Sequence, residues 1–173
     1  MAEMEESTIE VGAPAPDFTL KDQDGEDVTL SSFHGKRNVV LMFFPLAFSG
    51  GCTRQFTSVG RQVDRYGDAD AVVLGVSVDS RYAQKAFADS LGLHDVKLLA
   101  DFEPKGEVAR RYGVYLGDRG FANRATFVID ALGVVRHSDV MPSTRDLPDE
   151  EAVLGALGAC PIPAGGSGES ARS

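Results

Sequence analysis

The chain has 173 residues, of which 43% are hydrophobic, and a formal net charge of −9. This length and composition suit one compact domain with its own core better than two domains. The acidic charge disfavours non-specific binding to nucleic acid or anionic lipid, because its long-range field repels both. The expected partners are therefore small molecules or proteins.

The two ends of the chain differ from its middle. Residues 1–10, MAEMEESTIE, are acidic and lack the apolar segment of a secretory signal. No apolar run approaches the roughly 18 residues of a membrane span. The last residues are small, polar and rich in Gly and Ser. We therefore expect flexible segments at 1–10 and 159–173, one ordered domain at 11–158, and a cytoplasmic protein without membrane attachment.

The first predicted element is a β-hairpin. Residues 17–30, DFTLKDQDGEDVTL, carry two short alternating runs around Asp24 and Gly25, a pair that is typical of a tight turn. The acidic residues also suggest a calcium loop, but the glycine is misplaced for an EF-hand and no glutamate closes one. A plain turn is the favoured interpretation.

Buried strands and amphipathic helices alternate after this hairpin. Residues 38–45 form an unbroken apolar run, which is typical of a strand buried on both faces. Phe56, Val59, Val63 and Tyr66 then follow at the spacing of one helical face. The pattern predicts an α/β fold, with a mixed central sheet flanked by helices and an N-terminal β-hairpin. The other expected elements are strands at 71–79, 96–101, 125–130 and 133–140, helices at 105–114 and 149–158, and a helix after the strand at 71–79 on which Ala83, Ala86, Phe87 and Leu91 share one face.

Cys52, one of two cysteines, falls at the start of the predicted helix that follows Pro45. Free amide hydrogens and the positive end of the helix dipole favour the thiolate there, and the thiolate is the nucleophile. Gly50 and Gly51 lack side chains, so their backbone can approach a substrate closely. Ser49 can offer its hydroxyl to the helix amides or to the sulfur and its substrate. A helix-face cysteine is more often a packing residue, so the residues alone leave both interpretations open.

Residues 45–52, PLAFSGGC, resemble the peroxiredoxin motif in which Pro45, Ser49 and Cys52 form the peroxide site. The resemblance extends over VGAPAPDFTL, VVLGVSVDS, LLADFEPKGEVARRYGV and ANRATFVID, and it is closest to the AhpE-type branch, whose sequences have a similar FFPLAF run. It implies a thioredoxin-like fold and a homodimer. It also implies a thiol-dependent peroxidase that reduces hydrogen peroxide and organic hydroperoxides through a sulfenic acid on Cys52.

The same resemblance nominates two more site residues. In the family a distant arginine joins the cysteine pocket, and its motif matches NRATFVID, which implies this role for Arg124 rather than that of a solvated charge. A guanidinium near the sulfur favours the thiolate and hydrogen-bonds the peroxide oxygens. Gln55 matches the family's Glu or Gln and is expected to order Arg124, with an exposed helix residue as the alternative. Arg54 lies about 200° around the helix from Cys52 and is expected at the surface.

Reduction of a sulfenic acid needs a thiol, and Cys160 is the only candidate within the chain. It precedes Pro161, as a resolving cysteine does in some peroxiredoxins. The AhpE-type sequences instead work with one cysteine and an external thiol, either of low molecular weight or on a thioredoxin- or glutaredoxin-like protein. An incidental thiol at a helix end is favoured for Cys160, with a resolving role as the alternative.

No metal or organic cofactor is expected, because the cysteines and the histidines His34, His94 and His137 lie at spacings unlike any zinc site. A dithiol oxidoreductase needs a cysteine at position 55, which is Gln, and a cysteine hydrolase needs a histidine base that no motif supplies. The remaining alternative is a redox-regulated chaperone or scaffold with the same fold. Loss of peroxide consumption on Cys52→Ser separates an enzyme from such a scaffold.

Overall fold

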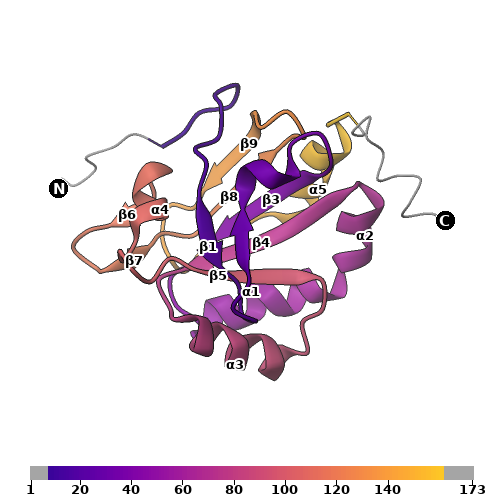
Figure 1. Cartoon of the computed structure of the whole chain (residues 1–173). Helices are drawn as coiled ribbons and strands as arrows, with labels where there is room; N and C mark the ends of the chain where they lie inside the picture. Colours follow the sequence, from indigo (N-terminus) through magenta and orange to yellow (C-terminus); the bar gives the residue numbers. More distant parts are fainter. Residues whose placement is uncertain (1–7, 162–173) are drawn as a thin grey trace.

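A seven-stranded mixed sheet forms the centre of the computed structural model, which describes residues 8–161. The strand order is β2-β1-β5-β4-β3-β8-β9. β3, β4 and β5 are parallel, whereas β8 runs antiparallel to β3 and β9 runs antiparallel to β8 (Figure 1). The strands are β1 (Thr19–Lys21), β2 (Asp27–Thr29), β3 (Asn38–Phe43), β4 (Ala71–Ser77), β5 (Val96–Ala100), β8 (Ala125–Ile129) and β9 (Val135–Val140).

The central strand β3 is buried along its whole length because its residues alternate between two cores. Val39, Leu41 and Phe43 belong to the core on one face of the sheet. Val40 and Met42 belong to the core on the other face. Side chains of a strand point alternately to its two sides, so a strand between two cores needs apolar residues at every position. The unbroken apolar run therefore predicted this strand correctly.

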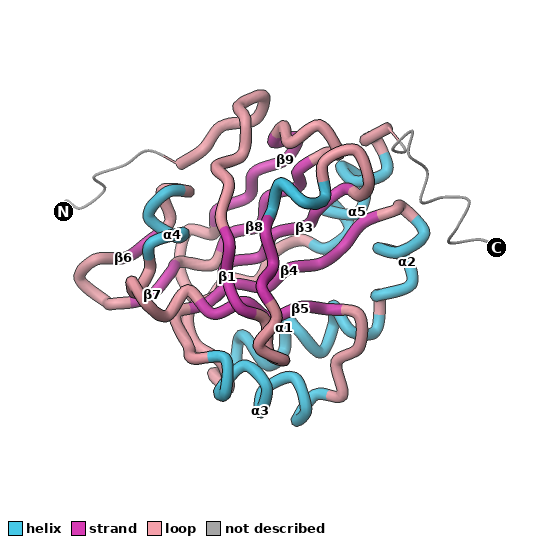
Figure 2. Tube along the Cα trace, viewed as in Figure 1, coloured by secondary structure: helices cyan, strands magenta, loops and turns pink. Residues whose placement is uncertain are grey.

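Helices cover both faces of the sheet, as the sequence predicted. The core that contains Val40 is closed by α1 (Gly50–Arg61), α2 (Val63–Asp68), α3 (Arg81–Leu91) and α5 (Glu150–Gly158). The other core is closed by the short 3-10 helix η1 (Leu30–Phe33) and by α4 (Glu107–Arg111). Figure 2 shows the helices surrounding the strands, with α3 and α1 near one another below the sheet.

Three local features differ from the expectation. The helix predicted from Cys52 to Tyr66 is interrupted at Gln62, whose φ of −110° and ψ of 13° separate α1 from α2. Tyr66 is still buried, so the apolar spacing describes a face that continues across the break. Helix η1 and the hairpin of β6 (Tyr115–Leu116) and β7 (Phe121–Ala122) were not predicted, because such short elements show no periodic pattern.

The expected N-terminal hairpin is confirmed, with β1 and β2 paired antiparallel. The carboxylate of Asp22 accepts the amides of Asp24 and Glu26 at 2.9 and 3.0 Å, and Gly25 has a φ of +83°. The carboxylate of Asp22 therefore stabilises the turn through hydrogen bonds to its backbone.

The flexible ends expected at 1–10 and 159–173 fall largely outside the described residues. Within the described part, the amide of Ile9 donates to the carbonyl of Tyr112 at 3.4 Å, and Cys160 is buried directly after α5. Between residues 8 and 161, no helix combines the length and apolarity needed to cross a membrane.

Candidate active site

The candidate site lies where β3 ends. The chain passes through Pro45 and a short loop and enters α1 at Gly50, with Ser49 as the N-cap residue in an extended conformation (φ −69°, ψ 157°). Cys52 is the third residue of the helix and lies in its first turn. Backbone amides of a first turn have no partners within the helix, so they favour a negative charge nearby.

Arg124 reaches Cys52 from the neighbouring strand. β8 pairs with β3 so that Ala125 lies opposite Phe43, which places the preceding arginine beside the start of α1. Nη1 of Arg124 lies 3.2 Å from Sγ of Cys52, and the two residues are 2% and 0% exposed. Screening by water is weak at a buried site, so the guanidinium of Arg124 and the sulfur of Cys52 interact with little attenuation by solvent.

Gln55 and Thr144 fix the orientation of Arg124. Nη1 also donates to Oε1 of Gln55 at 2.7 Å, while Nη2 and Nε donate to the carbonyl of Thr144 at 2.8 and 3.3 Å. Gln55 is buried rather than exposed, and its amide nitrogen lies 3.8 Å from Sδ of Met42. The arginine is thus held on several sides before any substrate is present.

The hydroxyl of Ser49 contacts neither the helix amides nor the sulfur of Cys52, and its contact with a substrate stays a prediction. Oγ donates to the carbonyl of Leu46 at 3.0 Å and does not cap the helix amides. The backbone carbonyl of Ser49 instead accepts the amide of Thr53 at 2.9 Å, which starts the helix. The hydroxyl therefore shapes the loop that leads to Cys52.

Gly51 allows the guanidinium to lie against the helix. A Cβ at this position would be 2.7 Å from Nη2 of Arg124, which is closer than carbon and nitrogen can approach. At Gly50 a Cβ would be 3.6 Å from Nη1 of Arg54, an ordinary contact. The two glycines expected to approach substrate thus differ, because only Gly51 leaves space that Arg124 occupies.

The loop before α1 is fixed to the end of β4. Oδ2 of Asp79 accepts the amide of Ala47 at 2.8 Å and the hydroxyl of Ser77 at 2.6 Å. That hydroxyl in turn accepts Nε2 of Gln84 at 2.9 Å. Asp79 was not among the predicted site residues. Its position at the end of a predicted buried strand was the signal, because parallel strands end at the same edge of a sheet.

A pocket of about 370 Å³ opens beside these residues. Cys52 itself is fully buried, so contact with a peroxide requires the groups that cover its sulfur to shift. A larger hollow of about 620 Å³ lies among α2 and the starts of β4 and β5, and neither cysteine lines it. The smaller pocket is lined by Pro45, Leu46, Ser49, Gly51, Arg54, Phe121, Arg124, Thr144 and Arg145.

Cys160 lies at the other end of β8. Its thiol donates to the carbonyl of Ala156 at 3.5 Å. Burial, and then the nearby carboxylate of Asp130, raise the pKa of this thiol above its ordinary value. An extended strand from Arg124 to Asp130 spans about 20 Å, so the fold does not bring Cys160 to Cys52 within one chain.

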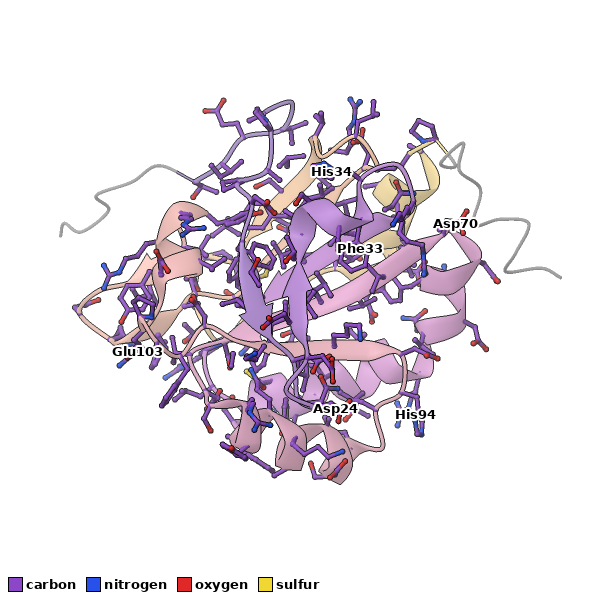
Figure 3. The ribbon with its side chains drawn as sticks, viewed as in Figure 1. Asp24, Phe33, His34, Asp70, His94 and Glu103 are labelled. Atoms are coloured by element: carbon purple, nitrogen blue, oxygen red, sulfur yellow. The ribbon has the colours of Figure 1, made fainter. Side chains whose placement is uncertain are left out.

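The three histidines do not gather at the site. Figure 3 shows His34 and His94 at well separated places on the molecule. Across residues 8–161 there is no group of three or more His, Cys, Asp or Glu side chains that could hold a metal ion.

Comparisons with known proteins show the family to which the chain belongs. The AhpC/TSA family model matches residues 11–138. Alkyl hydroperoxide reductase E of Mycobacterium tuberculosis is 38% identical over 151 residues, which cover 87% of this chain and 97% of that protein. Peroxiredoxin-2 of Rattus norvegicus is 35% identical over 163 residues, which cover 89% and 79%.

A solved structure shows the same fold. Peroxidoxin BcpB from Mycobacterium tuberculosis matches with a TM-score of 0.75 and 32% identity, over 85% of this chain and 95% of that chain. The thioredoxin-like α/β fold is thereby confirmed, and the class of protein is a thiol-dependent peroxidase of the peroxiredoxin type. The chain belongs to the AhpC/TSA family.

Proposed function

We propose that the chain reduces hydrogen peroxide and organic hydroperoxides with Cys52 as the attacking residue. The observation that carries this proposal is the 3.2 Å contact between Nη1 of Arg124 and the buried sulfur. The guanidinium and the free amides of the first helical turn both favour the thiolate, which is the reactive form. The names of the relatives, alkyl hydroperoxide reductase E and peroxiredoxin-2, support the same chemistry.

In the proposed step, the thiolate sulfur attacks the terminal oxygen of the hydroperoxide. A sulfur–oxygen bond forms as the oxygen–oxygen bond breaks, and the sulfur, oxidised by two electrons, becomes a sulfenic acid. The leaving oxygen takes the bonding pair and a proton, and it departs in an alcohol or, from hydrogen peroxide, in water. Arg124 serves as a hydrogen-bond donor to the oxygen on which charge develops.

We assign reduction of the sulfenic acid to an external thiol, either of low molecular weight or on a thioredoxin- or glutaredoxin-like protein. The first thiol forms a mixed disulfide and water, and a second thiol releases the Cys52 thiolate. The place of Cys160 beside Asp130, at the far end of β8, supports this assignment. The proposal includes a cytoplasmic homodimer, as the family resemblance implies, and Cys160 of a second subunit is the alternative resolving thiol.

The decisive experiment is intact mass after one equivalent of hydrogen peroxide, with dimedone as a sulfenic acid trap and no added thiol. We expect one adduct on Cys52 in the wild type and in Cys160→Ser, and none in Cys52→Ser. Loss of two hydrogens with a crosslink from Cys52 to Cys160 would make Cys160 the resolving residue. An unmodified wild-type protein would contradict the proposed function and leave a binding role.

A further inference from the structure

A series of hydrogen bonds runs from the interior of the sheet to the loop before α1. Nε2 of Gln84 donates to the carbonyl of Leu99 at 3.0 Å and to the hydroxyl oxygen of Ser77 at 2.9 Å. The hydroxyl of Ser77 donates in turn to Oδ2 of Asp79 at 2.6 Å, and the same oxygen accepts the amide of Ala47 at 2.8 Å. Gln84 and Ser77 are fully buried, so the carboxylate is held from the interior of the sheet before it meets the loop.

The amide of Ala47 is the point at which the end of β4 supports this loop. Across residues 8–161, no other hydrogen bond ties residues 45–49 to a segment apart from the helix that follows them. The amide and the hydroxyl of Ser49 both donate to the carbonyl of Leu46, at 3.3 and 3.0 Å, so they close the loop on itself. The polar support of the loop therefore comes from Asp79.

The residue after Ala47 has a backbone conformation that needs such support. Phe48 has a φ of +71°, in the left-handed region that residues other than glycine rarely adopt. The centroid of its ring lies 5.2 Å from that of Phe87, although Phe48 is 54% exposed. A conformation of this kind costs free energy and persists only where the neighbouring structure holds it. Without the bond to Asp79, we expect the loop to relax and Phe48 to leave this conformation.

A relaxed loop would move the start of α1. The carbonyl of Ser49 accepts the amide of Thr53, so the loop and the first helical turn share this residue. Cys52 lies in that turn, and its sulfur is 3.2 Å from Nη1 of Arg124. Arg124 is anchored outside the helix, to the carbonyl of Thr144. A shift of the turn would therefore separate the sulfur from its hydrogen-bond donor.

Two ordinary structural roles do not explain a carboxylate at position 79. Helix α3 begins with Ser80 as its N-cap, and the hydroxyl of Ser80 accepts the amide of Ala83 at 3.2 Å. Among the residues that the structure describes, no cationic side chain forms an ion pair with Asp79. Neither helix capping nor charge pairing therefore accounts for this residue.

We infer that Asp79 is a positioning residue for the peroxide reaction, and that it acts through Ala47 on the loop that leads to Cys52. The inference rests on the proposed function of Cys52 and adds a residue that supports that site. Asp79 keeps Phe48 in its left-handed conformation, and the first turn of α1 thereby keeps the sulfur beside Arg124. The position of the acceptor oxygen matters rather than its charge, because its partners are an amide and a hydroxyl.

Two substitutions separate the position of this oxygen from its charge. Asp79→Asn keeps a carbonyl oxygen at the same distance from the backbone but removes the charge, whereas Asp79→Glu keeps the charge on a side chain that is one methylene longer. Oxidation of Cys52 by hydrogen peroxide is followed in a single turnover by stopped flow, without any reductant. We expect the second-order rate constant to stay within about twofold of wild type for Asp79→Asn, and to fall about fivefold for Asp79→Glu and about tenfold for Asp79→Ala.

Phe48→Gly tests the link through the backbone. Glycine adopts a φ of +71° without strain, so the loop then needs less support from Asp79. In the Phe48→Gly background, Asp79→Ala should therefore lower the rate constant only about threefold, a difference that a double-mutant cycle measures. A general loss of stability would instead affect both backgrounds equally.

Asp17→Ala is the matched control for Asp79→Ala. Oδ1 of Asp17 accepts the amide of Ser31 at 2.8 Å, the same distance as that between Asp79 and the amide of Ala47. Ser31 belongs to η1, so this bond anchors η1 rather than the loop before α1. Urea denaturation gives the free energy of unfolding of both variants. Asp17→Ala should lower this free energy without changing the rate constant with peroxide.

Each outcome decides between the inference and the function on which it rests. Wild-type rate constants for Asp79→Glu and Asp79→Ala would overturn the inference, and so would equal effects of Asp79→Ala in both backgrounds. A slow Asp79→Asn beside an unimpaired Asp79→Glu would also overturn it, because charge rather than position would then matter. In all three cases oxidation of the wild type leaves the proposed function standing, whereas a wild type that peroxide does not oxidise would overturn both. If Asp79→Ala does not fold, the comparison of Asp79→Asn with Asp79→Glu still decides.

Discussion

Nη1 of Arg124 lies 3.2 Å from Sγ of Cys52, although 72 positions separate the two residues in the chain. The same guanidinium donates to Gln55 and to the carbonyl of Thr144. One side chain therefore sets the charge beside the sulfur and the position of the loop after β9. Its planar shape matters for this, because several N–H groups must point in fixed directions at once.

Replacing Arg124 by Lys keeps the charge but removes this planar set of donors. We expect the second-order rate constant with hydrogen peroxide to fall about 100-fold, the cost of losing one well-placed donor to developing charge. Stopped-flow measurement of Cys52 oxidation provides the rate constant, with Arg61→Lys as the control. A decrease of less than about threefold would mean that charge alone is sufficient.

Gly51→Ala tests the close approach of Arg124 to helix α1. Its Cβ would lie 2.7 Å from Nη2, so the guanidinium must move away from Cys52 or Thr144. The clash is with the end of a flexible side chain, so we expect a folded protein whose peroxide rate constant is about tenfold lower.

Gly155→Ala is the matched control for that substitution. Gly155 lies inside α5, and a Cβ there would have no atom within 4 Å. Alanine has the higher helix propensity, so the free energy of unfolding should rise by about 0.5–1 kcal/mol while the peroxide rate constant stays unchanged. Urea denaturation measures the first quantity, and a lower stability of Gly155→Ala would contradict the local geometry.

Glu150 anchors the start of α5 to α1 and α2. Its carboxylate accepts hydrogen bonds from Ser58, Gln62 and Tyr66. Burial, and then the bond to Glu150, raise the pKa of the Tyr66 phenol, which therefore remains a donor at neutral pH. We expect Glu150→Gln to lower the free energy of unfolding by about 1–2 kcal/mol, measured by urea denaturation.

The neighbouring Glu151 provides the comparison. It pairs with Arg65 at 2.7 Å, but the two side chains are 70% and 50% exposed. Glu151→Gln removes the same charge from the same helical turn, yet we expect a clearly smaller loss, because water screens an exposed ion pair. Equal losses for Glu150→Gln and Glu151→Gln would show that the helix dipole, rather than the buried contacts, explains the effect.

The sequence predicted those parts of the fold in which the polarity of each residue indicates whether its own position is buried. The run from Val39 to Phe43 is apolar at every position because both faces of β3 are buried. Cys52 was a candidate from its place at a helix start, and the family resemblance then favoured it over a packing residue. Arg124 was nominated by that resemblance alone, because the antiparallel pairing of β3 with β8 that joins the two residues leaves no local pattern.

The contacts that were missed depend on geometry that no single segment encodes. Thr144 contributes only a backbone carbonyl, which any residue type can supply. Asp79 supports the loop through the amide of Ala47, a contact that exists only after β3 and β4 pair in parallel. Arg54 lines the pocket through the reach of its side chain, which a helical wheel does not represent.

Asp130 should make the free energy of unfolding depend on pH in the acidic range. Its Oδ1 accepts the amides of Leu132 and Val134, and its Oδ2 accepts Nε of Arg136 at 2.7 Å. Burial raises the pKa of this carboxyl, but the amide bonds and the guanidinium outweigh burial and leave the pKa below its ordinary value. A carboxyl with a lowered pKa stabilises the fold above its unfolded-state pKa and loses that contribution as the pH falls through its folded-state pKa.

The measurement for Asp130 is the difference in the free energy of unfolding between the wild type and Asp130→Asn across pH. We expect about 1–2 kcal/mol at neutral pH, and a decrease once the pH falls below about 4. A difference that stays constant down to acid-induced unfolding would mean that the charge of Asp130 does not stabilise this turn.

The separation of the two cysteines by the length of β8 also has a kinetic consequence. With no second thiol of the same chain within reach of Cys52, oxidant and reductant must approach one sulfur through one opening. In the proposed mechanism the hydroperoxide and the thiol therefore bind one after the other, and the alcohol product leaves the pocket before the thiol enters. Initial rates measured against both substrates should follow a ping-pong pattern of parallel double-reciprocal lines, and a bulky hydroperoxide in excess should compete with the thiol for entry.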